Sequence, residues 1–221
     1  MKFRSKLVYL WIFMLTFIGG FINVGTIIFY GVPITHHTGN ISQLTKGLYG
    51  GEYQTVILLF SVILAFFLGA FLSGLLFYRR ELSPKKRYGG VLLICGIAVL
   101  IGWIFKIPAS IYIPTIAFIQ GLQNAMFIHY KGLLVRTTHM TGYLSDAGFN
   151  LGCALRGSKS GYRKFLFYIS VVLCFFIGGL VSAFVNNYHP SYIFLIAGIL
   201  YIFTGSYYFG IRRQFLEEKS K

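Results

Sequence analysis

Two short polar stretches carry residue types suited to binding a solute, and they are copies of each other. Residues 35–42 (THHTGNIS) return as residues 138–145 (THMTGYLS), with five of eight positions identical at a constant offset of 103 residues. Each stretch leads into a short segment whose apolar residues recur with helical spacing. We expect Thr38 and Thr141 to cap these short helices, because a threonine hydroxyl can accept a hydrogen bond from a free first-turn N–H group.

A helix N-terminus attracts anionic or polar groups, since its N–H groups are free and its dipole is positive there. Glycine after each threonine would leave the first turn open to such a group. Amide side chains inside apolar runs need internal partners, and they either line a polar cavity or join helices by hydrogen bonds. The predicted solute-binding set is Asn23, Thr38, Gly39, Asn40, Gln123, Asn124, Thr141 and Gly142. The alternative is that the threonines only cap interfacial helices and the amides only join neighbouring ones.

The residue pattern gives less support to proton coupling, metal binding or catalysis. Asp146, the only acidic residue between positions 82 and 216, could titrate in a proton-coupled cycle or simply be solvated. His36, His37 and His139 are metal-type ligands, but no Glu or Cys stands at matching spacing, and we expect the pair and the third histidine near opposite membrane faces. We therefore predict no metal and no cofactor. Without a phosphate-binding loop, nucleotide fingerprint or Ser/His/Asp arrangement, we do not expect an enzyme.

Composition places these residues in a membrane protein. The 221 residues are 56% hydrophobic and only 11% charged, whereas a soluble domain carries about a quarter charged residues. The net charge of +15 would suit a nucleic-acid binder, but its basic residues would then cluster on one soluble face. Here they flank apolar runs, so we expect no nucleic acid. Cys95, Cys153 and Cys174 have no metal-type spacing and are expected to be free thiols.

Six apolar runs are predicted to cross the bilayer, which takes about 20 residues in a helix. They are residues 7–30, 55–78, 88–105, 111–130, 165–185 and 191–211. The segments 40–49 and 144–155 are too short to span and must be interfacial or re-entrant. Small residues spaced by four form ridges that let helices approach closely. These ridges are Ala65, Gly69 and Ser73 in the second run, and Cys174, Gly178 and Ser182 in the fifth.

Charge and repetition predict the topology. Of the 20 lysines and arginines, only Lys46 and Lys106 fall outside the segments that share a side with the N-terminus, so both termini should be cytoplasmic. A second echo, FFLG at 66–69 and FFIG at 175–178, supports a duplicated unit. The predicted repeats are residues 1–106 and 107–221, each with three spans and one short helix. Because three is odd, the two repeats must lie inverted in the membrane.

The motifs GFIN (20–23) with TGN (38–40), GLQNA (121–125) and MTG (140–142) resemble the YoaK-like family of bacterial membrane proteins, over nearly the whole chain. The resemblance implies a multi-span protein of the bacterial cytoplasmic membrane, from a family without an established activity. Family members usually have Asp where this chain has Asn23. Any ion coupling that depends on that carboxylate would be lost here.

These observations predict an all-α membrane protein of six transmembrane helices, built as two inverted three-helix repeats. Its predicted role is a small secondary transporter or permease-like carrier with a polar site between the repeats. The alternatives are a membrane scaffold or assembly protein, and a metal-dependent membrane enzyme. The expected partners are the lipid bilayer and a small polar or anionic solute, and homo-oligomer formation is left open.

Overall fold

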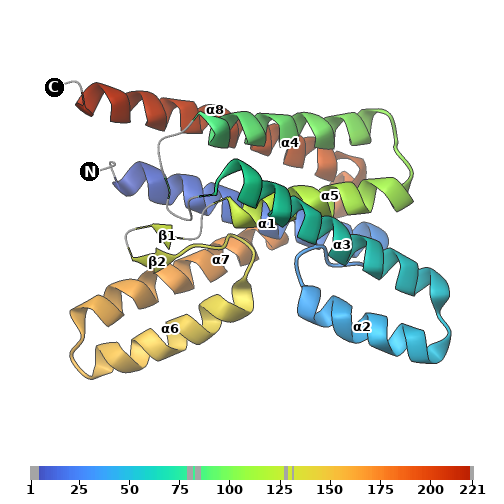
Figure 1. Cartoon of the computed structure of the whole chain (residues 1–221), viewed down its shortest axis with the longest axis horizontal. Coiled ribbons are helices and arrows are strands. Elements are labelled where there is room, and N and C mark those ends of the chain that lie inside the picture. Colours follow the sequence, from blue (N-terminus) through green and yellow to red (C-terminus); the bar gives the residue numbers. More distant parts are fainter. Residues whose placement is uncertain (1–4, 79–81, 83–85, 127–128, 131, 220–221) are drawn as a thin grey trace.

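Helices make up almost all of the described chain (Figure 1). The computed structural model describes residues 5–78, 82, 86–126, 129–130 and 132–219. Within them the α-helices are α1 (Ser5–Tyr30), α2 (His37–Gly50), α3 (Tyr53–Leu76), α4 (Arg87–Ile104), α5 (Ala109–Ala125), α6 (Met140–Leu155), α7 (Lys159–Tyr188) and α8 (Ile193–Lys219). A 3-10 helix, η1 (Pro190–Tyr192), precedes α8. Two short strands, β1 (His129–Tyr130) and β2 (Leu133–Leu134), pair antiparallel.

Five helical segments of the described chain are long and apolar enough to cross a membrane, namely α1, α3, α4, α7 and residues 190–214 of η1 and α8. The fourth predicted span, 111–130, is wrong at its end, because α5 stops at Ala125 after 17 residues. At about 1.5 Å per residue it extends about 25 Å, less than the ~30 Å hydrocarbon core. The chain then turns back through the β1–β2 hairpin, where Gly132 adopts a φ of 75° that glycine readily accepts.

The long helices pair across the two halves of the chain, α1 with α7, α3 with α5 and α4 with α8. Glycines let two of these pairs approach at backbone distance. A Cβ atom on Gly69 would overlap with the carbonyl oxygen of Phe118 on α5, and one on Gly178 with that of Phe17 on α1. Both predicted small-residue ridges therefore face a neighbouring helix, as expected.

The same two contacts are made in return by glycines of the partner helices. Gly20 on α1 meets the carbonyl oxygen of Phe175, and Gly121 on α5 meets that of Phe66, so that a Cβ on either glycine would overlap with it. The contacts correspond residue by residue, with Gly121 lying 101 positions after Gly20 and Phe175 lying 109 positions after Phe66. The α1–α7 and α3–α5 pairs are thus built alike.

In the third pair, α4 and α8 are each other's counterparts in the two halves of the chain. The Cβ position of Gly96 lies 2.8 Å from the carbonyl oxygen of Gly198, and that of Gly205 lies 3.0 Å from the carbonyl oxygen of Gly89. Gly198 follows Gly89 by 109 residues, and Gly205 follows Gly96 by the same number. The two helices run antiparallel, so one close contact repeats itself at each end.

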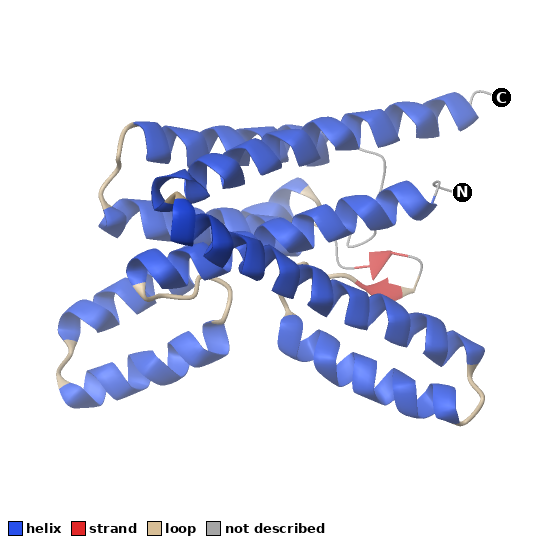
Figure 2. Cartoon of the chain, turned by 180° about the vertical axis from the view of Figure 1, so that it is seen from behind, coloured by secondary structure: helices blue, strands red, loops and turns tan. Residues whose placement is uncertain are grey.

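The short helices lie outside this bundle of paired helices. The helix α2 packs on α3, and α6 packs on α7, which makes two helical hairpins. The hairpins diverge from the middle of the molecule, so that α2 and α6 begin near each other and end far apart (Figures 1 and 2). This arrangement brings the two copies of the repeated THxTG stretch together.

Candidate functional site

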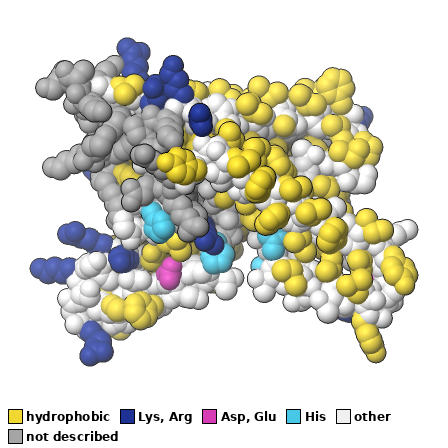
Figure 3. All heavy atoms as spheres, in the orientation of Figure 1, with side chains coloured by type: hydrophobic (Ala, Val, Ile, Leu, Met, Phe, Trp, Pro, Cys, Tyr) yellow, Lys and Arg dark blue, Asp and Glu magenta, His cyan; other side chains and the backbone are white. Residues whose placement is uncertain are grey.

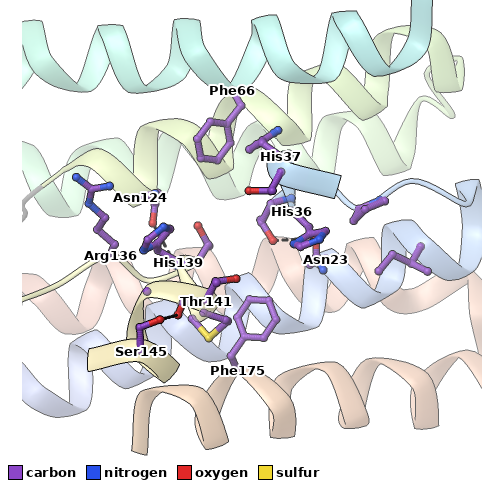
Figure 4. Close-up of a pocket in the computed structure, with 17 residues that line it drawn as sticks. Asn23, His36, His37, Phe66, Asn124, Arg136, His139, Thr141, Ser145 and Phe175 are labelled. Atoms are coloured by element: carbon purple, nitrogen blue, oxygen red, sulfur yellow. Dashed lines mark hydrogen bonds between the residues drawn. The ribbon is translucent and has the colours of Figure 1, made fainter. Parts of the chain in front are cut away.

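A cavity of about 590 Å³ lies where α2 and α6 begin (Figure 4). Both halves of the chain line it. The lining residues are Asn23, Ile27, Pro33, Thr35, His36, His37, Thr38 and Phe66 from the first half, and Asn124, Arg136, Thr138, His139, Met140, Thr141, Gly142, Ser145 and Phe175 from the second. In Figure 4, Phe66 and Phe175 point towards the cavity from α3 and α7.

Two asparagines hold the loops that lead into the short helices. The Asn23 side-chain oxygen accepts hydrogen bonds from the Thr35 backbone N–H (3.1 Å) and from the Thr35 hydroxyl (2.9 Å). The Asn124 side-chain oxygen likewise accepts from the Thr138 backbone N–H (3.1 Å). A buried N–H group needs such a partner. Each asparagine therefore attaches the start of a short helix to the long helix before it.

The predicted threonine caps are wrong. The N-cap residues are His36 and His139, and neither makes a side-chain capping bond. Thr38 and Thr141 are the second residues of their helices, two positions after the N-cap, and their carbonyl oxygens accept hydrogen bonds from serine hydroxyls one turn later. Without side-chain caps, the first-turn N–H groups of both helices keep no acceptor within the helix.

The two glycines of the repeated stretch make room for the histidine rings. A Cβ atom on Gly39 would overlap with the imidazole of His36, and one on Gly142 would overlap with that of His139. The sequence predicted that these glycines permit a close approach. The approaching group is the N-cap histidine of the same helix.

Not all predicted site residues line the cavity. Asn23, Thr38, Asn124, Thr141 and Gly142 do, and Gly39, Asn40 and Gln123 do not. Asn40 is fully buried and donates a hydrogen bond to the Pro33 carbonyl (2.7 Å). These placements separate the amides that face the cavity from those that join parts of the fold.

Gln123 connects three helices. Its side-chain nitrogen donates to the Leu15 carbonyl (3.0 Å) and to the Thr137 hydroxyl (2.8 Å), while its oxygen accepts from the Tyr201 hydroxyl (2.6 Å). These bonds tie α5 to α1 and α8. The helix-joining alternative therefore describes Gln123 better than the cavity-lining one.

The expected separation of the histidines is wrong, since His36, His37 and His139 all line the one cavity. They share the cavity because α2 and α6 begin near each other (Figure 1). Among the described residues, however, no three His, Cys, Asp or Glu side chains are grouped closely enough to hold a metal ion. The half-buried Asp146 lies outside the cavity lining, on the second turn of α6.

The charge of the cavity is positive. Among the described residues that line it, Arg136 is the one lysine or arginine, and no Asp or Glu is present. The pKa of His37 is lowered to about 4, chiefly by burial and further by His36, so this ring is neutral at pH 7. Its centroid lies 4.1 Å from that of the Phe66 ring. Burial also lowers the pKa of His139, and Arg136 adds to the effect while Asp146 opposes it.

Several lining residues were absent from the predicted solute-binding set, above all Arg136, His37 and the two phenylalanines. The phenylalanines belong to the repeated FFxG motif. This repetition could have predicted their place, because two equivalent halves that share a cavity line it with equivalent residues. Arg136 has no counterpart in the first half, where Pro33 occupies the equivalent position. Comparison of the repeats could not find it.

Residues 11–206 match the family described as "Protein of unknown function (DUF1275)". The chain belongs to this family. No curated protein and no solved structure matches it. The DUF1275 match agrees with the sequence resemblance in pointing to a family of unknown function, and its description includes neither the YoaK-like name nor a substrate. The geometry of the cavity is therefore the basis for any functional assignment.

Proposed function

We propose that this chain is a small secondary transporter that carries a small anionic solute across the cytoplasmic membrane. The observation that carries the proposal is a single cavity lined by equivalent residues of both halves, at the N-termini of two short helices. Secondary transporters often place their site between inverted repeats, at half-helix N-termini near the bilayer midplane. We assign the cavity a binding role and no catalytic one.

The proposed architecture is two inverted repeats, residues 1–106 and 107–221, with three spans and one re-entrant helix each. The matched glycine contacts of the α1–α7 and α3–α5 pairs support it, because an internal two-fold relation would make the two pairs alike. In this arrangement α5 is the fourth span along the chain and the shortest, and it completes the six spans beside the five long apolar segments. Figure 3 supports cytoplasmic termini, since most lysines and arginines on the visible face lie on the side of the molecule where both termini and the α6–α7 turn are found (Figure 1).

An anionic solute suits the cavity electrostatically. The uncapped first turns of α2 and α6 offer N–H donors and the positive ends of two helix dipoles. Arg136 adds a full positive charge, and no described carboxylate lines the cavity to neutralise it. A cation would meet these groups without a counter-charge. A membrane scaffold needs no cavity with polar groups between the two halves of the chain, so this cavity favours transport over the scaffold alternative.

The test is a screen of small anions as potassium salts (nitrate, formate, acetate and phosphate) by thermal unfolding of the purified chain, with glycerol and acetamide as neutral solutes. Arg136→Gln should weaken the binding of a stabilising anion about 10–100-fold, since a charge-assisted hydrogen bond contributes about 1.5–3 kcal/mol. Arg156→Gln is the matched control, because Arg156 is exposed just beyond the end of α6 and lies outside the cavity.

Uptake of the stabilising anion into proteoliposomes then separates binding from transport. We expect uptake by the wild type and by Arg156→Gln, and strongly reduced uptake by Arg136→Gln at low anion concentration. Stabilisation by the neutral solutes alone would contradict the anion preference. Binding without uptake would contradict the transporter assignment.

A further inference from the structure

A second groove lies away from the cavity, between the N-terminal parts of α1 and α7. Its volume is about 780 Å³, and its lining residues are Lys6, Tyr9, Leu10, Phe13, Leu133, Ser160, Arg163, Lys164, Leu166, Phe167 and Ser170. Polar and apolar residues are both present in this lining. What matters for a ligand is how they are distributed along the two helices.

The two helices run parallel here. The ring of Phe167 lies 5.7 Å from that of Tyr9 and 6.2 Å from that of Phe13 (centroid distances), and the Cys174 thiol donates to the Phe13 carbonyl (3.1 Å). Contacts therefore advance along both helices in the same direction. The N-terminal residues of α1 and α7 consequently lie at the same end of the groove.

This shared direction separates the groove into a cationic end and an apolar end. Lys6 precedes the apolar lining residues of α1, and Arg163 and Lys164 precede those of α7. Leu10 and Leu166, one turn or less further along, are 49% and 43% exposed and form part of the apolar end. The cationic end coincides with the end of the molecule where basic residues gather (Figure 3).

The charge at this end is uncompensated within the groove. Lys6 and Arg163 are exposed and Lys164 is half-buried, and no Asp or Glu is among the described residues that line it. Ser160 adds a hydroxyl beside them. A ligand that fits must therefore be anionic at one end and apolar along its length.

We propose that this groove binds an anionic phospholipid, with its phosphate at Lys6, Arg163 and Lys164 and an acyl chain along Leu10, Phe13 and Leu166. Basic pockets between transmembrane helices on the cytoplasmic side recognise anionic head groups in this way. A zwitterionic lipid carries its own ammonium group, which these three cations repel. A small free anion would leave the apolar end empty. The inference is independent of the transported solute, because the groove and the cavity share no lining residue.

Native mass spectrometry of the purified full chain tests the proposal, with dioleoyl phosphatidylglycerol and dioleoyl phosphatidylcholine as the competing probes. The wild type should retain phosphatidylglycerol preferentially. The triple variant Lys6→Gln/Arg163→Gln/Lys164→Gln should lose at least tenfold of that preference, because each basic side chain near the membrane surface contributes about a fivefold factor. Far-UV circular dichroism confirms that these surface substitutions leave the helices intact.

The matched control is Lys86→Gln/Arg156→Gln/Lys159→Gln, which removes three positive charges from segments predicted to face the cytoplasm and none from the groove lining. It should keep the preference. A second variant, Leu166→Asp, retains the three cations but places a carboxylate at the apolar end, and it should also lose the bound lipid. Equal losses in the two triple variants would overturn the proposal in favour of general surface charge. Displacement of the lipid by sodium phosphate alone would overturn it in favour of a small-anion site.

Discussion

The cavity has one wall from each half of the chain, and five pairs of residues occupy corresponding places in the two walls. The pairs are Asn23 and Asn124, Thr35 and Thr138, His36 and His139, Thr38 and Thr141, and Phe66 and Phe175. Two further places differ, with Pro33 opposite Arg136 and His37 opposite Met140 in the sequence correspondence. The matched asparagines and threonines hold the loops before the two short helices, while the unmatched Arg136 supplies the positive charge.

The matched residues therefore fix the geometry of the cavity, and the unmatched residues fix the chemistry of its surface. The two asparagines do the same task in both walls, since each accepts a hydrogen bond from the threonine before an N-cap histidine. Arg136 acts in one wall only, and so does the neutral His37 ring packed on Phe66. A duplicated framework thus presents an asymmetric surface to a solute. That asymmetry would make the two sides of the site unequal in their contact with an anion.

The largest expected effect concerns whether the two halves of the chain lie inverted in the membrane. In a cysteine-free background, Glu52→Cys follows α2 and Ser158→Cys follows α6, so each reports the far end of one short helix. In intact cells a membrane-impermeant thiol reagent should label Glu52→Cys and leave Ser158→Cys unlabelled, because inverted repeats place these turns on opposite membrane faces.

After the membrane is made permeable, both cysteines should react, which controls for their accessibility. Labelling of both positions from the same side in intact cells would contradict the inverted arrangement. The cavity would then need another explanation for its matched walls.

Packing offers the next largest effect. Gly69→Leu and Gly178→Leu should each lower the free energy of unfolding in detergent by about 1–3 kcal/mol, because the new side chain must displace a backbone carbonyl of the neighbouring helix. Gly74→Leu is the matched control on α3, where a Cβ atom meets nothing within 4 Å. Similar losses at Gly69 and Gly178 would support equivalent contacts. A loss in only one of them would show that the two pairs are not equally tight.

The smallest expected effect concerns the histidine that one wall has and the other lacks. The pKa of His37 is lowered to about 4, from an ordinary value of 6.5, mainly by burial. The unfolded chain therefore binds more protons than the folded chain between these values, so the wild type loses stability as the pH falls from about 6.5 to 4. His37→Met copies the residue of the second half and should not lose this contribution.

Thermal unfolding of the wild type and His37→Met at pH 7 and pH 4.5 measures the difference. The midpoint of the wild type should drop further than that of the variant. His189→Met serves as the control for an exposed histidine in the turn after α7. Equal drops in the wild type and His37→Met would show that His37 is not held neutral by burial.

The features that depend on local chemistry can be predicted from the amino-acid sequence. Apolar length predicts which segments can span, because a bilayer needs a continuous apolar helix. Small residues at Gly69 and Gly178 predict close packing, since only a missing side chain lets two backbones meet. The repeated stretches, read at a constant offset, predict that two equivalent elements exist. All three properties can be recognised in the sequence without knowing which segments pack against one another.

Which polar groups face the cavity depends on tertiary packing and could not be predicted from the sequence. Gln123 and Asn124 are adjacent in the sequence, yet Gln123 bonds to α1 and α8 while Asn124 lines the cavity. His36 and His139 line the same cavity although 103 residues separate them, because their helices begin near each other. Arg136 enters the site through a loop that follows an unexpected hairpin. The physical reason is the same each time: a polar side chain is satisfied by whichever distant segment packs against it, and local sequence does not specify that segment.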